Sequence, residues 1–298
     1  MSKVVFLSIF PNAENIKDGY VRRVEDIEAV FRNEPRLHLE VSFTKNLKRR
    51  TQQVDPLLEV IYCNAFLHFF LILRILRSAK FIYSHSIIRL LKVWPQFILM
   101  GRQYRLVIDV HGAVPEEFAM RGQRMSSRLY GWLEYYFFHR SRLLIHVTDA
   151  MKKFYESKYP SLTSENVVYY IVNQPGTGVT NEGEELLRSQ LRIQEGDVVI
   201  MYSGNCQVWQ NVDLMLQLIS SQRRENYKYI ILTGEPAAFR AKLDKYGLDE
   251  AMVTVLSVTP KELPAYYTLA HYGFILRDNS AVNIVANPTK LGEYRNME

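Results

Sequence analysis

The stretch VVIMYSGNCQVWQNVDLML, residues 198–216, contains the structural unit from which the fold can be inferred. Its first part belongs to an apolar run over 197–204 that is typical of a buried parallel strand and ends at Gly204. A helix is predicted to follow over 211–223. A helix N-terminus after such a turn offers unpaired N–H groups and a partial positive charge, which favour an anion. A single glycine turn is more often an ordinary connection.

The same alternation of strand and helix extends in both directions along the chain. Strands are predicted over residues 3–10, 37–43, 79–86, 104–112, 142–150, 165–174, 197–204, 227–235, 251–258 and 272–277. Helices are predicted within 11–31 and over 87–101, 126–140, 151–159, 211–223, 236–247 and 260–270. This order indicates parallel sheets flanked by helices, whose ligands bind beyond the carboxyl ends of the strands.

A compositional break divides the chain into two parts. The segment NQPGTGVTNEGEE, residues 173–185, is rich in Gly, Pro, Asn and Thr and poor in large apolar residues. We therefore expect an α/β protein with two Rossmann-like domains, residues 1–174 and 196–298, joined by a linker over 175–195.

The composition is that of a soluble globular protein, with 48% apolar and 23% charged residues in a chain of 298. No signal peptide is expected at the N-terminus. Cys63 and Cys206 lie far apart in the sequence, which favours reduced thiols in a cytosolic protein over a disulfide framework. No Cys/His cluster has the spacing of a metal site, so no metal is expected.

The apolar stretch over residues 65–100 is interrupted by charged side chains, and no uncharged run approaches the ~20 residues that a membrane-spanning helix needs. Buried helices and strands are therefore expected here. The alternative is a basic, amphipathic helix that rests on a membrane surface.

The charge is distributed unevenly between the two halves. Residues 1–172 contain 25 Lys and Arg against 16 Asp and Glu, a net charge of +9, whereas residues 173–298 contain 12 against 15, a net charge of −3. The basic half, with the run Lys45, Lys48, Arg49 and Arg50 in a predicted loop, suggests an anionic membrane face, a phosphorylated substrate or nucleic acid, or simply a solvated surface. No basic and aromatic recognition module is visible, so no nucleic-acid partner is expected.

Several familiar motifs are absent, including the dinucleotide-binding glycine fingerprint, the Walker A loop, the nucleophile elbow, the HExxH zinc motif and any D-x-D pair that would hold a metal–diphosphate. A metal-free transferase is compatible with this, provided that amides, cations and helix dipoles hold the phosphates.

The segment NPTKLGE, residues 287–293, supplies a second helix start. Asn287 suits the N-cap and Pro288 the first helical position. Lys290 is unfavourable in the first turn of a helix, so either a phosphate or plain surface exposure explains it. Glu293 lies three residues after Lys290, on the same helix face.

In their order and spacing these pieces resemble the GT-B glycosyltransferases, specifically the large retaining group that builds bacterial lipopolysaccharide and capsular polysaccharide. The resemblance covers the whole chain and is most specific over residues 198–216, 229–235, 253–280 and 283–294. It implies a metal-independent hexosyltransferase that needs no cofactor. The donor would be a UDP- or GDP-hexose, and the acceptor a lipid-linked or cell-surface glycan. The enzyme would be cytoplasmic, or peripheral on the inner face of the cell membrane.

The resemblance also implies a donor site in the second domain. Glu293 would take the ribose hydroxyls of the nucleotide, and Gly204 would form the turn beside the diphosphate. Many relatives carry an Arg and a Lys where this chain has Asn205 and Gln210. These two side chains donate hydrogen bonds but bring no charge, which leaves Lys290 as the main cation.

In the first domain the resemblance points to a glycine and to a strand-end histidine. Gly19, in the loop after the first strand, would lie beside the acceptor and the donor phosphates, although it could be an ordinary turn glycine. His111 would contact the donor sugar as the catalytic side chain, although it could be structural. Glu116 and Glu117, expected in the following loop, could face the acceptor. No general base is assigned, because the resemblance implies that the leaving phosphate oxygen takes the acceptor proton.

Two rival interpretations remain open. A nucleotide-sugar epimerase shares the two-domain fold but would require more acid–base residues than the sequence identifies. The other rival is a non-catalytic remnant or partner subunit, because the resembling enzymes continue beyond the helix that begins at Asn287, whereas this chain ends at Glu298. We therefore expect a shortened chain that binds nucleotide weakly and has little transferase activity alone.

Overall fold

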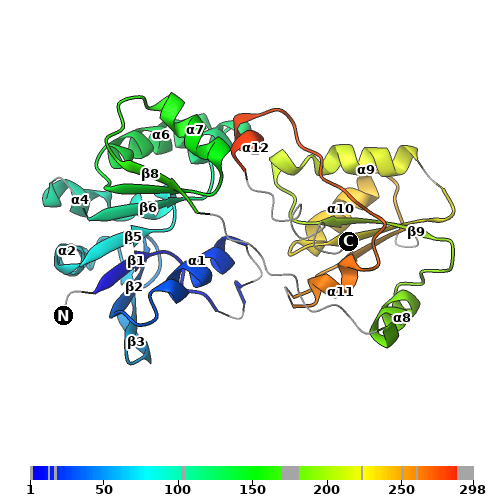
Figure 1. Ribbon diagram of the computed structural model, residues 1–298, viewed down its shortest axis with the longest axis horizontal. Helices are drawn as coiled ribbons and strands as arrows, with labels where there is room; N and C mark the ends of the chain where they lie inside the picture. Colours follow the sequence, from blue (N-terminus) through cyan, green and yellow to red (C-terminus); the bar gives the residue numbers. More distant parts are fainter. Residues whose placement is uncertain are drawn as a thin grey trace. The chain divides into compact units, whose positions relative to one another are not determined.

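The computed structural model describes residues 3–12, 14–16, 19–101, 105–169, 181–222, 224–249, 252–259 and 261–286. The chain forms two compact units (Figure 1), the first from Met1–Ile171 with Ile284–Asn287 and the second from Val172–Asn283 with Pro288–Glu298. Each unit contains its own sheet, with strands that are mostly parallel and helices packed against them. The predicted fold class, two Rossmann-like domains, is confirmed.

The first unit is built on an eight-stranded sheet in the order β3-β4-β2-β1-β5-β6-β7-β8. Its strands are β1 (Val4–Leu7), β2 (Arg36–Ser42), β3 (Arg50–Asp55), β4 (Leu58–Asn64), β5 (Phe81–Ser84), β6 (Leu106–Val110), β7 (Leu143–His146) and β8 (Glu165–Val168). Every pairing is parallel except that of β3 with β4. Neither strand of this edge hairpin was predicted from the sequence. The segment RTQQVD, which forms β3, has no apolar alternation, and its side chains are mostly exposed.

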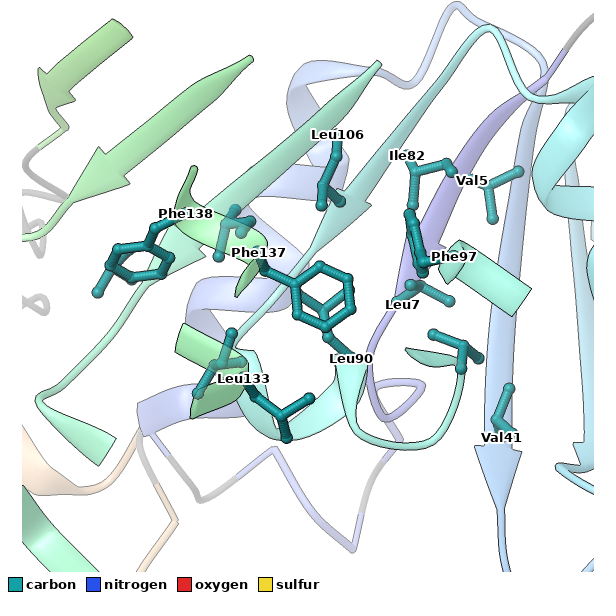
Figure 2. Packing of buried hydrophobic residues seen from close by; sticks show 14 of the residues in the cluster. Val5, Leu7, Val41, Ile82, Leu90, Phe97, Leu106, Leu133, Phe137 and Phe138 are labelled. Atoms are coloured by element: carbon teal, nitrogen blue, oxygen red, sulfur yellow. The ribbon is translucent and has the colours of Figure 1, made fainter. Parts of the chain in front are cut away.

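The main core of the first unit lies on one face of this sheet, where α2 to α7 pack. The helices of the unit are α1 (Gly19–Val30), α2 (Phe69–Ser78), α3 (Ile87–Leu90), α4 (Trp94–Met100), α5 (Val114–Met120), α6 (Arg124–Phe138) and α7 (Asp149–Lys158). Figure 2 shows Phe97 of α4 beside Leu7 and Ile82 of the strands, with Phe137 and Leu133 of α6 in the same cluster. The alternation of the strands sends Val5 and Leu7 to this face.

The opposite face of the sheet carries α1. Val4 and Phe6 of β1 pack there with Ile27 of α1 and Tyr83 of β5. The period of two along a strand explains why neighbouring residues of one short strand are buried on two different faces. Because α1 begins above the carboxyl ends of the central strands, its first turns can reach the side chains that follow β5 and β6.

The second unit contains a four-stranded parallel sheet in the order β11-β10-β9-β12. Its strands are β9 (Val198–Ser203), β10 (Tyr227–Leu232), β11 (Val253–Leu256) and β12 (Tyr272–Gly273). Its helices are α8 (Asn181–Gln190), the 3-10 turn η1 (Val208–Gln210), α9 (Val212–Ser221), α10 (Pro236–Lys245) and α11 (Leu263–Tyr267), while α12 (Ala281–Val285) leads back to the first unit. The helix α8 lies within the predicted linker.

Several predicted elements differ from the structure. The helix expected over 87–101 is two short helices, because α4 begins anew at Trp94 with Pro95 in its first turn. The strand expected over 272–277 is limited to Tyr272–Gly273. Glu116 and Glu117 lie in α5 and not in a loop. Among the described residues no helix has the length and apolarity that crossing a bilayer requires.

Candidate functional site

The candidate site lies at the carboxyl ends of β5 and β6 in the first unit. His85 follows β5, and His111 follows β6, as predicted for a strand-end histidine. Ser84 pairs with Ile108 in the parallel register, so His85 and Asp109 come next on adjacent strands. Alternation along β6 directs Asp109 to the face that α1 covers.

An ion pair between Arg23 of α1 and Asp109 forms the centre of this site. The Arg23 Nη2 donates to Asp109 Oδ1 at 2.7 Å, and Arg23 Nε donates to Oδ2 at 2.9 Å. The Asp109 side chain is fully buried and that of Arg23 is 9% exposed. A two-point contact between a guanidinium and a carboxylate fixes the geometry as well as the charge. Arg23 also donates to the backbone oxygen of Tyr169.

Two histidines also lie beside the carboxylate of Asp109. His111 Nε2 lies 2.9 Å from Asp109 Oδ2, and His85 Nδ1 lies 3.5 Å from the same oxygen. Since an ionised carboxylate only accepts hydrogen bonds, Nε2 of His111 is the donor in this contact, and Nδ1 is the ring nitrogen left for a ligand. The His111 ring lies 5.0 Å from that of Tyr20, whose hydroxyl donates to the His85 backbone oxygen at 2.6 Å.

The charges of the cluster follow from burial and from these contacts. Burial alone would raise the pKa of Asp109, but His111, His85 and Arg23 together hold it well below its ordinary value. Burial lowers the pKa of His85, and the nearby Asp109 offsets only part of this effect. At neutral pH the cluster therefore contains an ionised Asp109, a charged Arg23 and a neutral His85.

The cluster presents one accessible side chain to a ligand. The His111 side chain is 16% exposed, whereas those of His85 and Asp109 are fully buried. The ligand atoms of His85, Asp109 and His111 lie within 4.8 Å of one another, as in a possible metal site. The guanidinium of Arg23, however, already occupies both oxygens of Asp109 and would repel a cation. The geometry therefore favours an oriented histidine that binds a polar ligand through Nδ1.

A second buried network holds the backbone after His111. Glu134 of α6 accepts hydrogen bonds from Lys158 Nζ at 2.6 Å and from the Tyr159 hydroxyl at 2.7 Å. The Tyr155 hydroxyl lies 3.0 Å from Glu134 Oε2 and 3.2 Å from the Gly112 backbone oxygen. A cavity of about 10 Å³ lies between this network and the His111 ring. That volume holds about one water molecule and is too small for a substrate, so the network is structural support.

The residues predicted on the acceptor side are placed as follows. Gly19 is the first residue of α1, and a Cβ atom there would meet nothing within 4 Å, so space is open beside it. Glu116 accepts from Lys158 Nζ at 2.7 Å and belongs to the network around Glu134. The Glu117 carboxylate lies against Gly112, where an added Cβ would be 2.2 Å from Oε1, and burial raises its pKa. The structure thus brings Glu116 and Glu117 near the loop after His111.

A groove of about 490 Å³ beside α1 is lined by Phe10, Pro11, Glu25, Glu28, Ala29, Arg32, Arg36, Asp55, Pro56, Leu57 and Leu58. Behind it, Ser8 Oγ lies 3.1 Å from His38 Nε2, and His38 Nδ1 lies 2.7 Å from Glu28 Oε1. The order of these groups is that of a hydrolase triad. Ser8 and His38 are buried and do not line the groove, so no substrate carbonyl reaches the hydroxyl.

In the second unit, three of the residues predicted to bind the donor, Gly204, Asn205 and Gln210, lie between β9 and α9. Gly204 has a φ of 154°, a conformation that favours glycine. Asn205 is exposed, and Gln210 ends η1 before α9 begins at Val212. The predicted bounds, a strand that ends at 204 and a helix that begins at 211, each differ from the structure by one residue. The Cys206 N–H donates to the carboxylate of Glu235 at 2.9 Å, so an anionic group already binds one amide of this turn.

Lys290 and Glu293, the remaining predicted donor residues, lie outside the described residues. The sequence did not identify Arg23, His85 or Asp109 as site residues. DVHG could have suggested a strand-end Asp–His pair, since Asp109 and His111 are two residues apart on one face. Arg23 lies 86 residues before Asp109, and only the parallel topology brings them together.

No protein-family model and no curated protein sequence matches this chain. Solved structures do match. Sucrose-phosphate synthase from Thermosynechococcus elongatus has a TM-score of 0.68 at 11% identity, over 98% of this chain and 79% of that one. Anabaena HepE in complex with UDP and glucose has a TM-score of 0.67 at 14% identity, and the match covers 100% of this chain and 79% of HepE. WaaG, a glycosyltransferase of lipopolysaccharide biosynthesis, has a TM-score of 0.65 at 15% identity, and the match covers 97% of this chain and 78% of WaaG.

These structures share the GT-B fold. At such low identity the similarity establishes the architecture of this chain, two Rossmann-like units in GT-B order, and confirms the resemblance in fold that the sequence suggested.

Proposed function

We propose that this GT-B chain is a glycosyltransferase that moves a hexose from a nucleotide-sugar to a lipid-linked or cell-surface glycan, with retention of configuration and without a metal. The observation that carries the proposal is the joint occurrence of the GT-B fold and an oriented, accessible His111 at the carboxyl edge of the first sheet. Among the matching structures, HepE was solved with UDP and glucose, and a trehalose-phosphate synthase is described as UDP-forming.

In this proposal the first unit positions the sugar. Asp109 holds the proton of His111 on Nε2, so that Nδ1 accepts a hydrogen bond from a sugar hydroxyl. Arg23 keeps Asp109 ionised, and the buried network around Glu134 fixes the backbone that follows His111. Binding energy spent on orientation lowers the barrier by presenting the reacting atoms in line.

The second unit and the end of the chain would hold the nucleotide. The turn at Gly204 and the N-terminus of α9 would face the diphosphate, with hydrogen bonds from Asn205 and Gln210 and a positive charge from Lys290. Glu293 would bind the ribose hydroxyls. The proton of the acceptor would go to the leaving phosphate oxygen, and the donors around that oxygen would stabilise the negative charge that develops on it.

A nucleotide-sugar epimerase is the second candidate, and the cluster of His85, Asp109 and His111 supplies titratable groups for it. The full burial of Asp109 and its pairing with Arg23 favour a positioning role over proton transfer. The non-catalytic alternative differs from both in its outcome, because neither a transfer product nor an epimer would form.

The test is a donor screen with the full chain. UDP- and GDP-hexoses are incubated with and without glycan acceptors, and the release of nucleoside diphosphate and the identity of the sugar product are measured. Transfer predicts acceptor-dependent release from at least one donor, slowed by His111→Ala and unchanged by the exposed control Asp244→Asn. An epimeric nucleotide-sugar without release would instead support the second candidate, and unchanged donors throughout would contradict both enzymatic proposals.

A further inference from the structure

A mixed apolar and basic surface lies at the tips of two adjacent loops in the first unit. The loop after β2 exposes Phe43 and Leu47, and the loop after β4 with the start of α2 exposes Phe66, Leu67 and Phe70. Leu47 is 64%, Phe66 70% and Phe70 80% exposed. Single exposed apolar residues are common on protein surfaces, but a contiguous group marks an interaction site. We call this group, together with Lys45, Lys48, Arg49 and Arg50, the tip surface.

The two loops form one surface because a buried asparagine joins them. Ser42 and Asn64 are register partners at the ends of β2 and β4. The Asn64 side chain donates to the backbone oxygens of Phe43 and Lys45 at 3.0 and 3.1 Å. Its Oδ1 accepts from the backbone N–H groups of Phe66 and Leu67, 3.0 and 3.2 Å away. The exposed side chains therefore project from a pinned backbone, and the rings of Phe43 and Phe66 stack at 5.5 Å.

The charge around the tip surface is positive and uncompensated. Residues 41–108 contain eleven Lys and Arg but only two acidic residues, Asp55 and Glu59. Both acidic residues are already paired, Asp55 with Arg36 at 3.0 Å and Glu59 with Lys3 at 2.6 Å. Within the part of the chain that the structure describes, Lys45, Lys48 and Arg49 form no ion pair.

We propose that the tip surface inserts into an anionic phospholipid bilayer. Phe and Leu at the tips need no hydrogen-bond partners and can enter the boundary between headgroups and acyl chains, while the lysines and arginines remain at the level of the lipid phosphates. A nucleic acid would use the cations but would leave Leu47, Leu67 and Phe70 without an apolar environment. The combination of both features favours a membrane.

The tip surface and the candidate site lie at the same edge of the first sheet, at the carboxyl ends of parallel strands. β2 and β6 are separated by β1 and β5, so the ends of β2 and β6 lie three strand spacings, about 14 Å, apart along the same sheet edge. A chain anchored through the tip surface would hold His111 close to the membrane. This consequence, but not the insertion itself, rests on the proposed transfer to a lipid-linked acceptor.

The first experiment measures binding of the full chain to vesicles by flotation. Vesicles of phosphatidylcholine are compared with vesicles that contain about one-third phosphatidylglycerol. Binding is expected only to the anionic vesicles, and raising the salt from about 0.1 M to about 1 M should weaken it, because the Debye length falls from about 10 to about 3 Å. The double variant Lys45→Gln, Lys48→Gln should lower the affinity for anionic vesicles at least tenfold, because each positive charge near the surface contributes roughly fivefold. The matched control, Lys153→Gln with Lys261→Gln, removes two exposed lysines elsewhere.

The second experiment separates insertion from surface attraction. Phe66→Ser with Phe70→Ser leaves every charge in place and should lower affinity by roughly tenfold or more, since each Phe side chain loses its apolar environment. The control, Met125→Ser with Leu186→Ser, changes two residues that are 87% and 60% exposed. All variants should have the same melting temperature as the unmodified chain. The variant Phe66→Trp adds tryptophan fluorescence to that of the unmodified chain. If the tip surface inserts, brominated acyl chains should quench this added fluorescence.

Several outcomes would overturn the proposal. Binding that depends on salt but is unaffected by the phenylalanine variant would reduce the surface to an electrostatic contact. Equal losses in both control variants, or no binding to anionic vesicles, would also contradict it. A dimer in light scattering that dissociates in the phenylalanine variant would assign the tip surface to a second copy of the chain. Failure of donor turnover alone would contradict the proposed enzyme but leave insertion intact.

Discussion

Replacing Asp109 by asparagine tests whether the buried ion pair organises the candidate site. The substitution keeps the size of the side chain but removes the charge that Arg23 contacts at 2.7 and 2.9 Å. Arg23 would then keep its positive charge in a site where its side chain is 9% exposed. We expect a strong loss of stability, since the guanidinium has no comparable partner left.

The magnitude follows from the burial of both groups. Removing one member of a buried ion pair typically costs about 3–5 kcal/mol, because the other charge stays buried without compensation. For a unit of this size about 1 kcal/mol corresponds to roughly 2–4 °C, so the melting temperature should fall by about 6–20 °C. Arg23→Met should have a similar effect. The double variant should lose less than the sum of the two, because no buried charge remains.

Urea unfolding and thermal melting of the four proteins in this cycle supply the measurement. Asp244→Asn is the matched control, because Asp244 is exposed on α10, where substitutions usually change stability by less than about 0.5 kcal/mol. If Asp109→Asn unfolds together with this control, or if the Arg23 and Asp109 effects are additive, the ion pair does not organise the site and the reasoning is wrong.

Three further predictions concern ligand binding and pH. His111→Ala should slow transfer and leave nucleotide affinity nearly unchanged by calorimetry, because His111 is placed against the sugar; an equal loss of nucleotide binding would contradict that placement. Glu293→Ala should weaken nucleotide binding by about 1.5–3 kcal/mol, the range for a hydrogen bond to a charged group; unchanged affinity would remove Glu293 from the site. Burial lowers the pKa values of His85 and His146, so the unfolded chain binds more protons below about pH 6.5, and the urea midpoint should fall as pH decreases through that range. A flat profile would contradict the neutral, buried state of these histidines.

The sequence predicts the architecture well because the apolar strands are clearly delimited. Val4–Leu7 and Tyr227–Leu232 are short apolar runs bounded by polar segments, and their order along the chain specifies parallel sheets. The edge strand Arg50–Asp55 was missed because its side chains are polar and its existence depends on pairing with β4. The break between α3 and α4 coincides with Pro95 in the first turn of α4.

The candidate site was only partly predictable. The position of His111 follows from the strand that precedes it, but its partners come from remote segments. Arg23 was part of an amphipathic helix, and nothing in the pattern of that helix distinguishes a buried arginine from an exposed one. The basic run Lys45 to Arg50 was recognised as charged, whereas the exposure of Phe66 and Phe70 became visible only when the loops after β2 and β4 were placed side by side.

The proposed function requires that this chain binds a nucleoside diphosphate as part of a sugar donor. The most direct test is a calorimetric titration of the full chain with UDP and with GDP, with uridine and guanosine as controls that lack the diphosphate. We expect saturable binding of at least one diphosphate with one site per chain and markedly weaker binding of its nucleoside, because amides and a cation hold the phosphates in the proposed site. Absence of binding for both diphosphates, or equal binding of the nucleoside, would contradict it.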